Sequence, residues 1–482
     1  MDKTIIIIGK HPIAEDLLRQ YKGRGHVVIW HQELLIADVD LNDTCELYLL
    51  ANDGEDHKAV AMLEELADKY DFEAHKGKRL TCHLLVKKNE TLRMLQTCDL
   101  CDVVRQKIDV YPFTMDEVWS RDILLDYEPI TIQSEKHVHL VIFGMGEIAE
   151  MVAIHVAHVA HYPNYIRNHS IRTRITMIDV DAENKCKAFL DRYQHLFDNS
   201  YYRLVKPYEE KTVVRFHQPM YEGQREDFVD VEWEFVEADI SNVDVREKLR
   251  SWAKDKKQLL TVVMASQAKD KNASQALFLP NELYEQHIPI HIYGQQDTKY
   301  DVTLPLVRMA KNVNYIYDRC YNENIADWQG SLRYSVEIDE GERDYSWAKL
   351  SNVKRMSSIY NAMTIPSKMR SLGLEENDWD KFYDIPQQEI EIMAQVEHNR
   401  WSVEELILGF RPCTDEEQEK IAADIKKQKA VYKARKIHYD LRAYNDLRPD
   451  GTGKPVQIYD LCLTSCLPLI VKAFADEKGG EV

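Results

Sequence analysis

The chain has 482 residues, 44% of them apolar, and a formal net charge of −19. This length predicts about three domains at roughly 150 residues each, and the acidic balance argues against sequence-independent binding to nucleic acid or to an anionic membrane. No apolar run approaches the roughly 18 residues of a membrane helix, and nine cysteines are too few for a disulfide scaffold. We therefore expect a cytoplasmic protein with reduced thiols and no nucleic-acid partner.

Strand and helix patterns alternate through the first 130 residues. Ile5–Ile8 is a continuous β-branched run, as a strand buried on both faces requires, and the apolar spacing after it predicts a helix. Further strands are expected at 27–30, 47–50 and 82–86, with another helix at 59–70. This alternation is typical of βαβ units on a parallel sheet.

The same pattern begins again near residue 136. The expected strands lie at 137–143, 174–179, 232–236, 259–264 and 289–293. Gly144…Ile148-Ala149-Glu150 matches Gly9…Ile13-Ala14-Glu15 at a constant offset of 144 − 9 = 135 residues. We interpret this match as a tandem duplication. It predicts an α/β protein with two tandem Rossmann-like, doubly wound parallel sheets, in domains 1–130 and 131–324.

A glycine-rich turn follows the first expected strand of the second copy. Gly144-Met145-Gly146-Glu147-Ile148-Ala149 fits the G-x-G-x-x-A pattern, in which the glycines allow a tight turn and a close approach of pyrophosphate to the backbone. Acids that end the next two strands can bond ribose hydroxyls or lie near an adenine. The candidate cofactor-binding residues are Gly144, Met145, Gly146, Glu147, Ile148, Asp179 and Asp239. NAD(H) or another adenine nucleotide is the expected cofactor, and the alternative is that the glycines serve packing alone.

The first copy departs from this pattern. Gly9-Lys10-His11-Pro12-Ile13-Ala14 keeps one glycine, and His11 stands where the second glycine would be. The Cβ of His11 would crowd a pyrophosphate. We expect the first domain to be a degenerate copy with a structural or dimerising role.

The two copies resemble the TrkA-N/RCK family of nucleotide-binding regulators of potassium transport. The resemblance rests on Gly144, Gly146, Ala149, Asp179 and the strand end Glu237-Ala238-Asp239-Ile240. It implies cytosolic, ligand-gated regulation or scaffolding without catalysis, and it implies a homodimer.

The sequence is mainly helical after about residue 325. We expect a helical connector at 325–385 and an all-α module at 386–475. In the first helix of that module, an apolar stripe is formed by Ile392, Val396, Val403, Ile407 and Phe410, and the opposite side carries Ala394, His398, Trp401, Glu405 and Leu408. An aromatic and a titratable group opposite a core stripe require a second partner, which is either another helix or a ligand.

This module resembles the RyR domain, which is repeated in ryanodine receptors and also occurs in bacterial proteins. The resemblance lies in Glu397-His398-Asn399-Arg400-Trp401, Leu408-Gly409-Phe410-Arg411, Lys436-Ile437-His438-Tyr439-Asp440-Leu441, Tyr444-Asn445-Asp446-Leu447 and Tyr459-Asp460. Tyr439 departs from the proline that the family often has. The resemblance implies a non-enzymatic sensing or interaction module of bacterial signalling or defence, with a nucleotide-like ligand.

The candidate ligand contacts of the module are His398, Arg400, Trp401, Arg411, Tyr444 and Asp460. Aromatic rings can stack on a base, and arginines can bond phosphate. The alternative is that Trp401 and Tyr444 belong to the core and that His398 and Asp460 fix loops by hydrogen bonds.

Other cysteines and histidines do not form a metal-ligand pattern. Cys98-Asp99-Leu100-Cys101 is a single C-x-x-C, which we expect to be buried thiols, and Cys462 and Cys466 fit packing on one helical face. Of His155, His158 and His161, we expect the first in a core and the other two at the surface. No metal is expected.

Together these patterns predict a ligand-sensing regulatory protein that is not an enzyme. Nucleotides are expected to bind at the second Rossmann-like domain and at the RyR-type module, and a separate membrane or effector protein would receive the output. Two alternatives remain: an NAD(P)-dependent oxidoreductase, and an interaction scaffold whose sites are vestigial.

Overall fold

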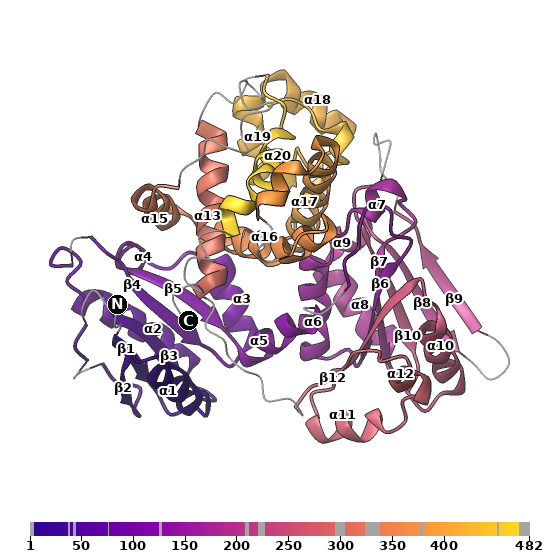
Figure 1. Ribbon diagram of the computed structural model, residues 1–482, viewed down its shortest axis with the longest axis horizontal. Coiled ribbons are helices and arrows are strands. Elements are labelled where there is room, and N and C mark those ends of the chain that lie inside the picture. Colours follow the sequence, from indigo (N-terminus) through magenta and orange to yellow (C-terminus); the bar gives the residue numbers. More distant parts are fainter. Residues whose placement is uncertain are drawn as a thin grey trace. The chain divides into compact units, whose positions relative to one another are not determined.

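The computed structural model describes residues 4–36, 39–41, 45–75, 77–124, 128–207, 212–219, 227–294, 304–322, 338–375, 379–450 and 453–471. These residues form two compact units, each described by itself (Figure 1). Unit 1 holds the described residues of Met1–Asp122 and Glu340–Met356, and unit 2 holds those of Ile123–Asp297, Leu304–Asp339 and Ser357–Val482. Both units contain a parallel sheet, so the expected α/β class is confirmed.

Unit 1 is built on a five-stranded parallel sheet in the order β2-β1-β3-β4-β5. Its strands are β1 (Thr4–Ile8), β2 (Val27–His31), β3 (Cys45–Leu50), β4 (Leu80–Leu85) and β5 (Ile108–Phe113). Its helices are α1 (Ile13–Gly23), α2 (Asp56–Lys69), α3 (Asn89–Thr97), α4 (Asp102–Lys107), α5 (Met115–Arg121) with η1 (Asp122–Leu124) after it, and α15 (Glu340–Lys349).

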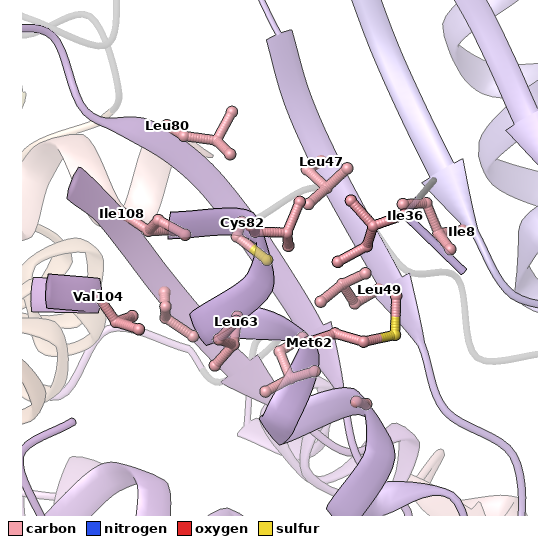
Figure 2. Packing of buried hydrophobic residues seen from close by; sticks show 14 of the residues in the cluster. Ile8, Ile36, Leu47, Leu49, Met62, Leu63, Leu80, Cys82, Val104 and Ile108 are labelled. Atoms are coloured by element: carbon pink, nitrogen blue, oxygen red, sulfur yellow. The ribbon is translucent and has the colours of Figure 1, made fainter. Parts of the chain in front are cut away.

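One face of this sheet is apolar and the other is partly polar. Figure 2 shows Leu47, Leu49 and Cys82 of the sheet packed against Met62 and Leu63 of α2. Because strand side chains alternate between faces, the intervening positions of the same strands carry the opposite layer. There the buried carboxylate of Glu46 accepts hydrogen bonds from the hydroxyls of Tyr21 (3.2 Å) and Tyr48 (3.0 Å).

Unit 2 contains a seven-stranded sheet in the order β12-β11-β6-β7-β10-β8-β9, parallel except for the antiparallel pair β8–β9. Its strands are β6 (His137–Phe143), β7 (Thr173–Asp179), β8 (Tyr201–Pro207), β9 (Thr212–His217), β10 (Val231–Glu237), β11 (Gln258–Met264) and β12 (Ile290–Ile292). The helices among them are α6 (Glu147–Val159), α7 (Asn164–Arg167), α8 (Ala182–Arg192), α9 (Gln194–Asp198), α10 (Val243–Lys254), α11 (Lys269–Ala276) and α12 (Asn281–Glu285).

Helices cover both faces of the second sheet. Val245 and Leu249 of α10 and Leu283 of α12 pack on one face. On the other face, Phe189 of α8 contacts the ring of Trp233 on β10, and α6 packs on β6. The central strands of the sheet are therefore buried on both faces, and polar side chains such as His139 of β6 and Glu234 of β10 are enclosed with the apolar ones.

The remaining elements of unit 2 are mainly helical. They are α13 (Leu304–Asn322), most of α16 (Asn352–Ser371), η3 (Trp379–Asp384), α17 (Gln387–Ile407), α18 (Asp415–Ala423), α19 (Ile425–Lys433), η4 (Tyr444–Asp446) and α20 (Ile458–Ser465). A short parallel pair, β13 (Arg411–Pro412) and β14 (Ile437–His438), lies in the region that we expected to be all-helical.

The helical part of unit 2 shares its packing with the sheet. α17 packs against α6, α7 and α9, and α13 packs against α20. The expected domain boundary at residue 324 lies outside the described residues. It would place α13 and α20, which pack on each other, in different domains. In the described residues, no helix combines the length and apolar character of a membrane span.

α6 is buried on two sides, and this corrects one expectation. His155, His158 and His161 are all buried, whereas we expected the last two at the surface. The His158 ring stacks on Tyr360 of α16, with the ring centroids 4.0 Å apart. His161 bonds Asp230 (2.7 Å) and the carbonyl oxygen of Ala157 (2.9 Å). The apolar stripe of α6 faces the sheet, and the histidines fill the space against the neighbouring elements.

The two matched glycines occupy the same backbone conformation. Gly9 follows β1 and Gly144 follows β6, and both have φ of +117°. A Cβ on Gly9 would lie 2.3 Å from the carbonyl oxygen of Leu50, and one on Gly144 would lie 3.1 Å from that of Ala265. Each glycine is required because the loop after the neighbouring strand passes too close for a side chain.

Gly9→Ala is expected to lower the free energy of unfolding by about 3 kcal/mol, since both the positive φ and the contact with Leu50 oppose a Cβ. Gly25→Ala is the matched control. Gly25 also has a positive φ, but a Cβ on it would meet no atom within 4 Å, so about 1 kcal/mol is expected. Urea unfolding of both variants tests the difference, and equal losses would contradict the steric argument.

Acid is expected to destabilise unit 2 through His139 of β6. Burial lowers the pKa of His139 to about 3, and its ring nitrogens contact Gln258 (2.7 Å) and Thr176 (2.8 Å). The unfolded chain takes up this proton near pH 6.5, so stability is complete above that pH and falls toward pH 3, by up to about 1.4 kcal/mol per pH unit. His139→Gln should flatten this slope in urea titrations, and an unchanged slope in this variant would contradict the role of His139.

Candidate functional site

A cleft of about 200 Å³ opens at the carboxyl end of the second sheet. It is lined by Phe143, Gly144, Met145, Gly146, Ile178, Asp179, Val180, Lys185, Ala238, Asp239, Ile240, Ser266, Gln267, Lys271 and Gln275. Strand order reverses at β6, because β7 lies on one side of it and β11 on the other. In open α/β sheets, such a point leaves a crevice beyond the strand ends where ligands bind.

Gly146 differs from Gly144 in that the fold does not require it. Its φ of −91° is open to any residue. A Cβ at this position would meet the side chain of Gln267 at 3.7 Å, which is ordinary van der Waals contact. The protein therefore gives no internal reason for a glycine here, and the missing side chain leaves the cleft open beside the backbone.

The N-terminus of α6 faces this opening. Its N-cap is Gly146, and no side chain caps it, so the first-turn N–H groups carry the positive end of the helix dipole. Glu147 is exposed at the first turn, whereas the side chain of Ile148 is buried in α6. Neither of these two predicted residues lines the cleft with its side chain.

The two predicted acids lie at or just after the ends of the neighbouring strands β7 and β10, on the same side of β6. The Asp179 carboxylate accepts hydrogen bonds from the backbone N–H groups of Met145 (3.1 Å) and Asp181 (3.0 Å) and from the Lys185 ammonium (2.8 Å). These bonds use three of about four acceptor positions on the carboxylate. Asp239 accepts from the backbone N–H of Ser241 (2.9 Å).

The loop after β11 supplies residues that the sequence did not single out. Ser266, Gln267, Lys271 and Gln275 line the cleft from this loop and α11. Asn272, which is fully buried, holds the loop by bonding the backbone N–H and carbonyl of Ser266 (both 2.8 Å). The position of the four cleft residues could have been inferred once β11 was placed beside β6, since neighbouring parallel strands bring the segments that follow them together.

The corresponding position in unit 1 is filled by a side chain. Nδ1 of His11 accepts a hydrogen bond from the backbone N–H of Ile13 (3.3 Å) at the start of α1. Burial and the nearby Lys87 ammonium lower the pKa of His11 to about 4, so the imidazole is neutral near pH 7. The imidazole takes the place that an anion would need at this helix start.

Four of the six residues predicted as ligand contacts in the helical module come together. His398 lies beside the rings of Trp401 (5.5 Å between centroids) and Tyr444 (5.7 Å). Its Nε2 donates to the carbonyl oxygen of Arg442 (2.8 Å), and its Nδ1 lies 3.4 Å from Oδ2 of Asp460. Burial raises the pKa of Asp460, and bonding to Asp460 outweighs burial to raise the pKa of His398. Both shifts favour the retention of a proton by the pair.

Arg400 lies in a different, buried network. Its guanidinium pairs with Glu397 (2.9 Å) and Glu404 (2.7 Å), and it is 2% exposed. Burial opposes the charge on Glu397, but Arg400 and the Lys368 ammonium outweigh it and lower the pKa of Glu397 to about 2. The expectation that Arg400 bonds a ligand phosphate is not supported, because both of its carboxylate partners are inside the core.

Arg411 is also engaged by a carboxylate. Its two terminal nitrogens bond both oxygens of Glu417 (2.8 and 2.7 Å), and Glu417 also belongs to the capping box of α18. Arg411 therefore fixes the start of α18 and lies apart from the cluster around His398.

No protein-family model matches the chain, and no curated protein matches it. Among solved structures, NtrX from Brucella abortus aligns with 89% of this chain and 100% of that chain, at 10% identity and a TM-score of 0.14. An alignment with so low a TM-score carries no argument about fold or function.

The described residues hold no group of three or more side chains suited to a metal ion. Cys98 and Cys101 are exposed, which corrects the expectation that they are buried. Cys462 and Cys466 are buried on α20, as their spacing predicted.

Arg400→Met is expected to lower the free energy of unfolding by about 3–5 kcal/mol, because it leaves Glu397 and Glu404 buried without their partner. Arg411→Met removes a partly exposed pair and should change stability by less than about 1 kcal/mol. Chemical unfolding distinguishes the two. A small effect at Arg400 would mean that its charge is not needed inside the core.

Proposed function

We propose that this protein is a non-catalytic regulator that binds an adenine nucleotide or dinucleotide, such as NAD(H), in the cleft beside Gly146. The observation that carries the proposal is the unexplained absence of a side chain at Gly146. A ligand that approaches the backbone at the start of α6 supplies the reason that the fold does not.

We further propose that the two sheets are tandem Rossmann-like copies. Strands β10-β7-β6-β11-β12 have the order 3-2-1-4-5, and the five strands of unit 1, β2-β1-β3-β4-β5, have the related doubly wound order 2-1-3-4-5. The matched glycines support this relation. The first copy is then structural, because His11 occupies its helix start.

The RyR-type module is proposed as a second ligand site, around Trp401, His398, Tyr444 and Asp460. Trp401 is half-buried and contacts His438 with an edge-to-face geometry (4.9 Å). The start of α6 lies at the cleft, and the same helix packs on α17, which carries His398 and Trp401. This path gives a nucleotide a physical means of affecting the helical part.

The output is proposed to pass to a separate effector or membrane protein in the cytoplasm, as signalling, defence or potassium-transport regulation. A homodimer is proposed from the family resemblance, and sedimentation that shows only a monomer would remove it. Turnover of NADH with any substrate would favour the oxidoreductase alternative. Absence of binding by every nucleotide would favour the scaffold.

Thermal unfolding with NAD, NADH, NADP, ATP, ADP-ribose and cyclic nucleotides tests the proposal. A ligand at a hundred times its Kd should stabilise the protein by about 2.7 kcal/mol. Gly146→Asp should abolish that shift, since a carboxylate would fill the opening, whereas Trp401→Ala should retain it. A shift that is lost only in Trp401→Ala would place the ligand in the helical module instead.

Glu147→Gln is expected to tighten the binding of a phosphate-bearing nucleotide by roughly two- to fivefold, or about 0.5–1 kcal/mol. The exposed Glu147 carboxylate lies at the start of α6 and opposes an anion there. Calorimetric titration at low salt measures the change, with Glu285→Gln as the control. Weaker binding in Glu147→Gln would contradict a phosphate at this helix start.

A further inference from the structure

Two buried thiols from distant parts of the chain meet where α13 packs on α20. The Sγ atoms of Cys320 and Cys462 are 2.6 Å apart, and both residues are fully buried. Cys320 is in α13, and Cys462 is 142 positions later in α20. Ordinary packing places sulfur atoms farther apart, so the two helices bring these thiols closer than packing needs.

The surroundings hold the two helices in place. Asn312 of α13 donates to the carbonyl oxygen of Ile470 (3.1 Å), and the Lys454 ammonium donates to the carbonyl oxygen of Cys320 (2.7 Å). Tyr317 packs on Tyr459 with ring centroids 5.4 Å apart. A bond between the sulfurs would therefore need only a small movement of the side chains, since the backbones are already positioned.

We infer that Cys320 and Cys462 form an oxidisable dithiol, in which a disulfide reversibly fastens α13 to α20. This inference does not depend on nucleotide binding. It concerns a modification site for small oxidants such as hydrogen peroxide, which can enter a packed region more readily than a bulky disulfide.

The chemistry requires one peroxide for each disulfide. One of the two sulfurs loses its proton, attacks one peroxide oxygen and breaks the O–O bond, giving a sulfenic acid and hydroxide, which is protonated to water. The other sulfur then attacks the sulfenic sulfur, its proton leaves with the hydroxyl group as a second water, and the S–S bond forms. In total, two thiols lose two electrons and two hydrogen atoms, and the peroxide is reduced to two waters.

The surroundings of the pair bear on the reaction in two ways. The hydrogen bond with Cys320 and burial both raise the pKa of Cys462. The Lys454 ammonium, which donates to the carbonyl oxygen of Cys320, favours negative charge on the sulfurs. Burial makes the reaction slow at rest, and it becomes faster when the α13–α20 contact opens.

Asp460 extends the consequence to the candidate ligand cluster. It lies two residues before Cys462 on α20, and its carboxylate faces His398. A disulfide at Cys462 would restrain the same turn of α20 that carries this carboxylate.

The test treats the reduced full-length protein with hydrogen peroxide, blocks remaining thiols, and maps peptides without reduction. We expect a linked peptide that joins Cys320 to Cys462, with the mass loss of two hydrogen atoms, and an increased Tm that dithiothreitol reverses. Cys320→Ser and Cys462→Ser should lose both effects. Cys466→Ser, one turn farther along α20, should retain them.

The wild-type peptide map decides the outcome even if a variant fails to fold. Recovery of Cys320 and Cys462 as free thiols, as separate sulfinic acids, or linked to other cysteines would overturn the inference. The exposed Cys98 and Cys101 serve as an internal check that the oxidant was active.

Discussion

The structure of unit 2 depends on the burial of α6 from two sides. This helix packs on β6 and also on α17, so Ile148, Val152 and Val156 are removed from water together with three histidines. A helix that is apolar around its circumference must be enclosed. The sheet alone covers only part of α6, and the helical elements complete the enclosure. The glycine turn therefore begins a helix whose position is determined by both parts of the unit.

Enclosure on this scale brings charged groups into the interior, and the structure neutralises them in local groups. Glu397, Arg400, Glu404 and Lys368 pair with one another between α16 and α17. His398 of α17 and Asp460 of α20 form a second group, in which His398 lies two residues before Arg400 and so on another face of α17. Removal of one partner from either group would strongly destabilise the protein, because the remaining charge would be buried alone. Charged residues that suggest a ligand site in the linear sequence can thus form ion pairs in the protein interior instead.

Most strands that were predicted from the sequence are central strands of the two sheets and are largely buried, whereas β2 and β12 were predicted from short apolar runs although they are edge strands. The missed strands have a different character. β5 contains Asp109 and Pro112, and it tolerates the proline because it is an edge strand. β9 is largely exposed, so its pattern resembles a loop.

The cleft residues around Gly144 could be predicted from the sequence of their turn. The presence of Gln267 and Lys271 in the cleft depends on which strands are neighbours in the sheet, and the local sequence does not show that. The buried partners of Arg400 lie on its own helix, yet nothing in that local sequence indicates that α16 covers them.

The docking of α13 on α20 has a consequence for how the chain can be divided. α13 precedes the expected connector, whereas α20 is near the end of the described chain. During synthesis, α13 is therefore made well before the helix on which it packs. α20 completes the interior of unit 2 and is not an accessory attached to a finished domain. A ribosome that stops before α20 would release a chain whose α13 has no partner, with its apolar side exposed to chaperones and proteases.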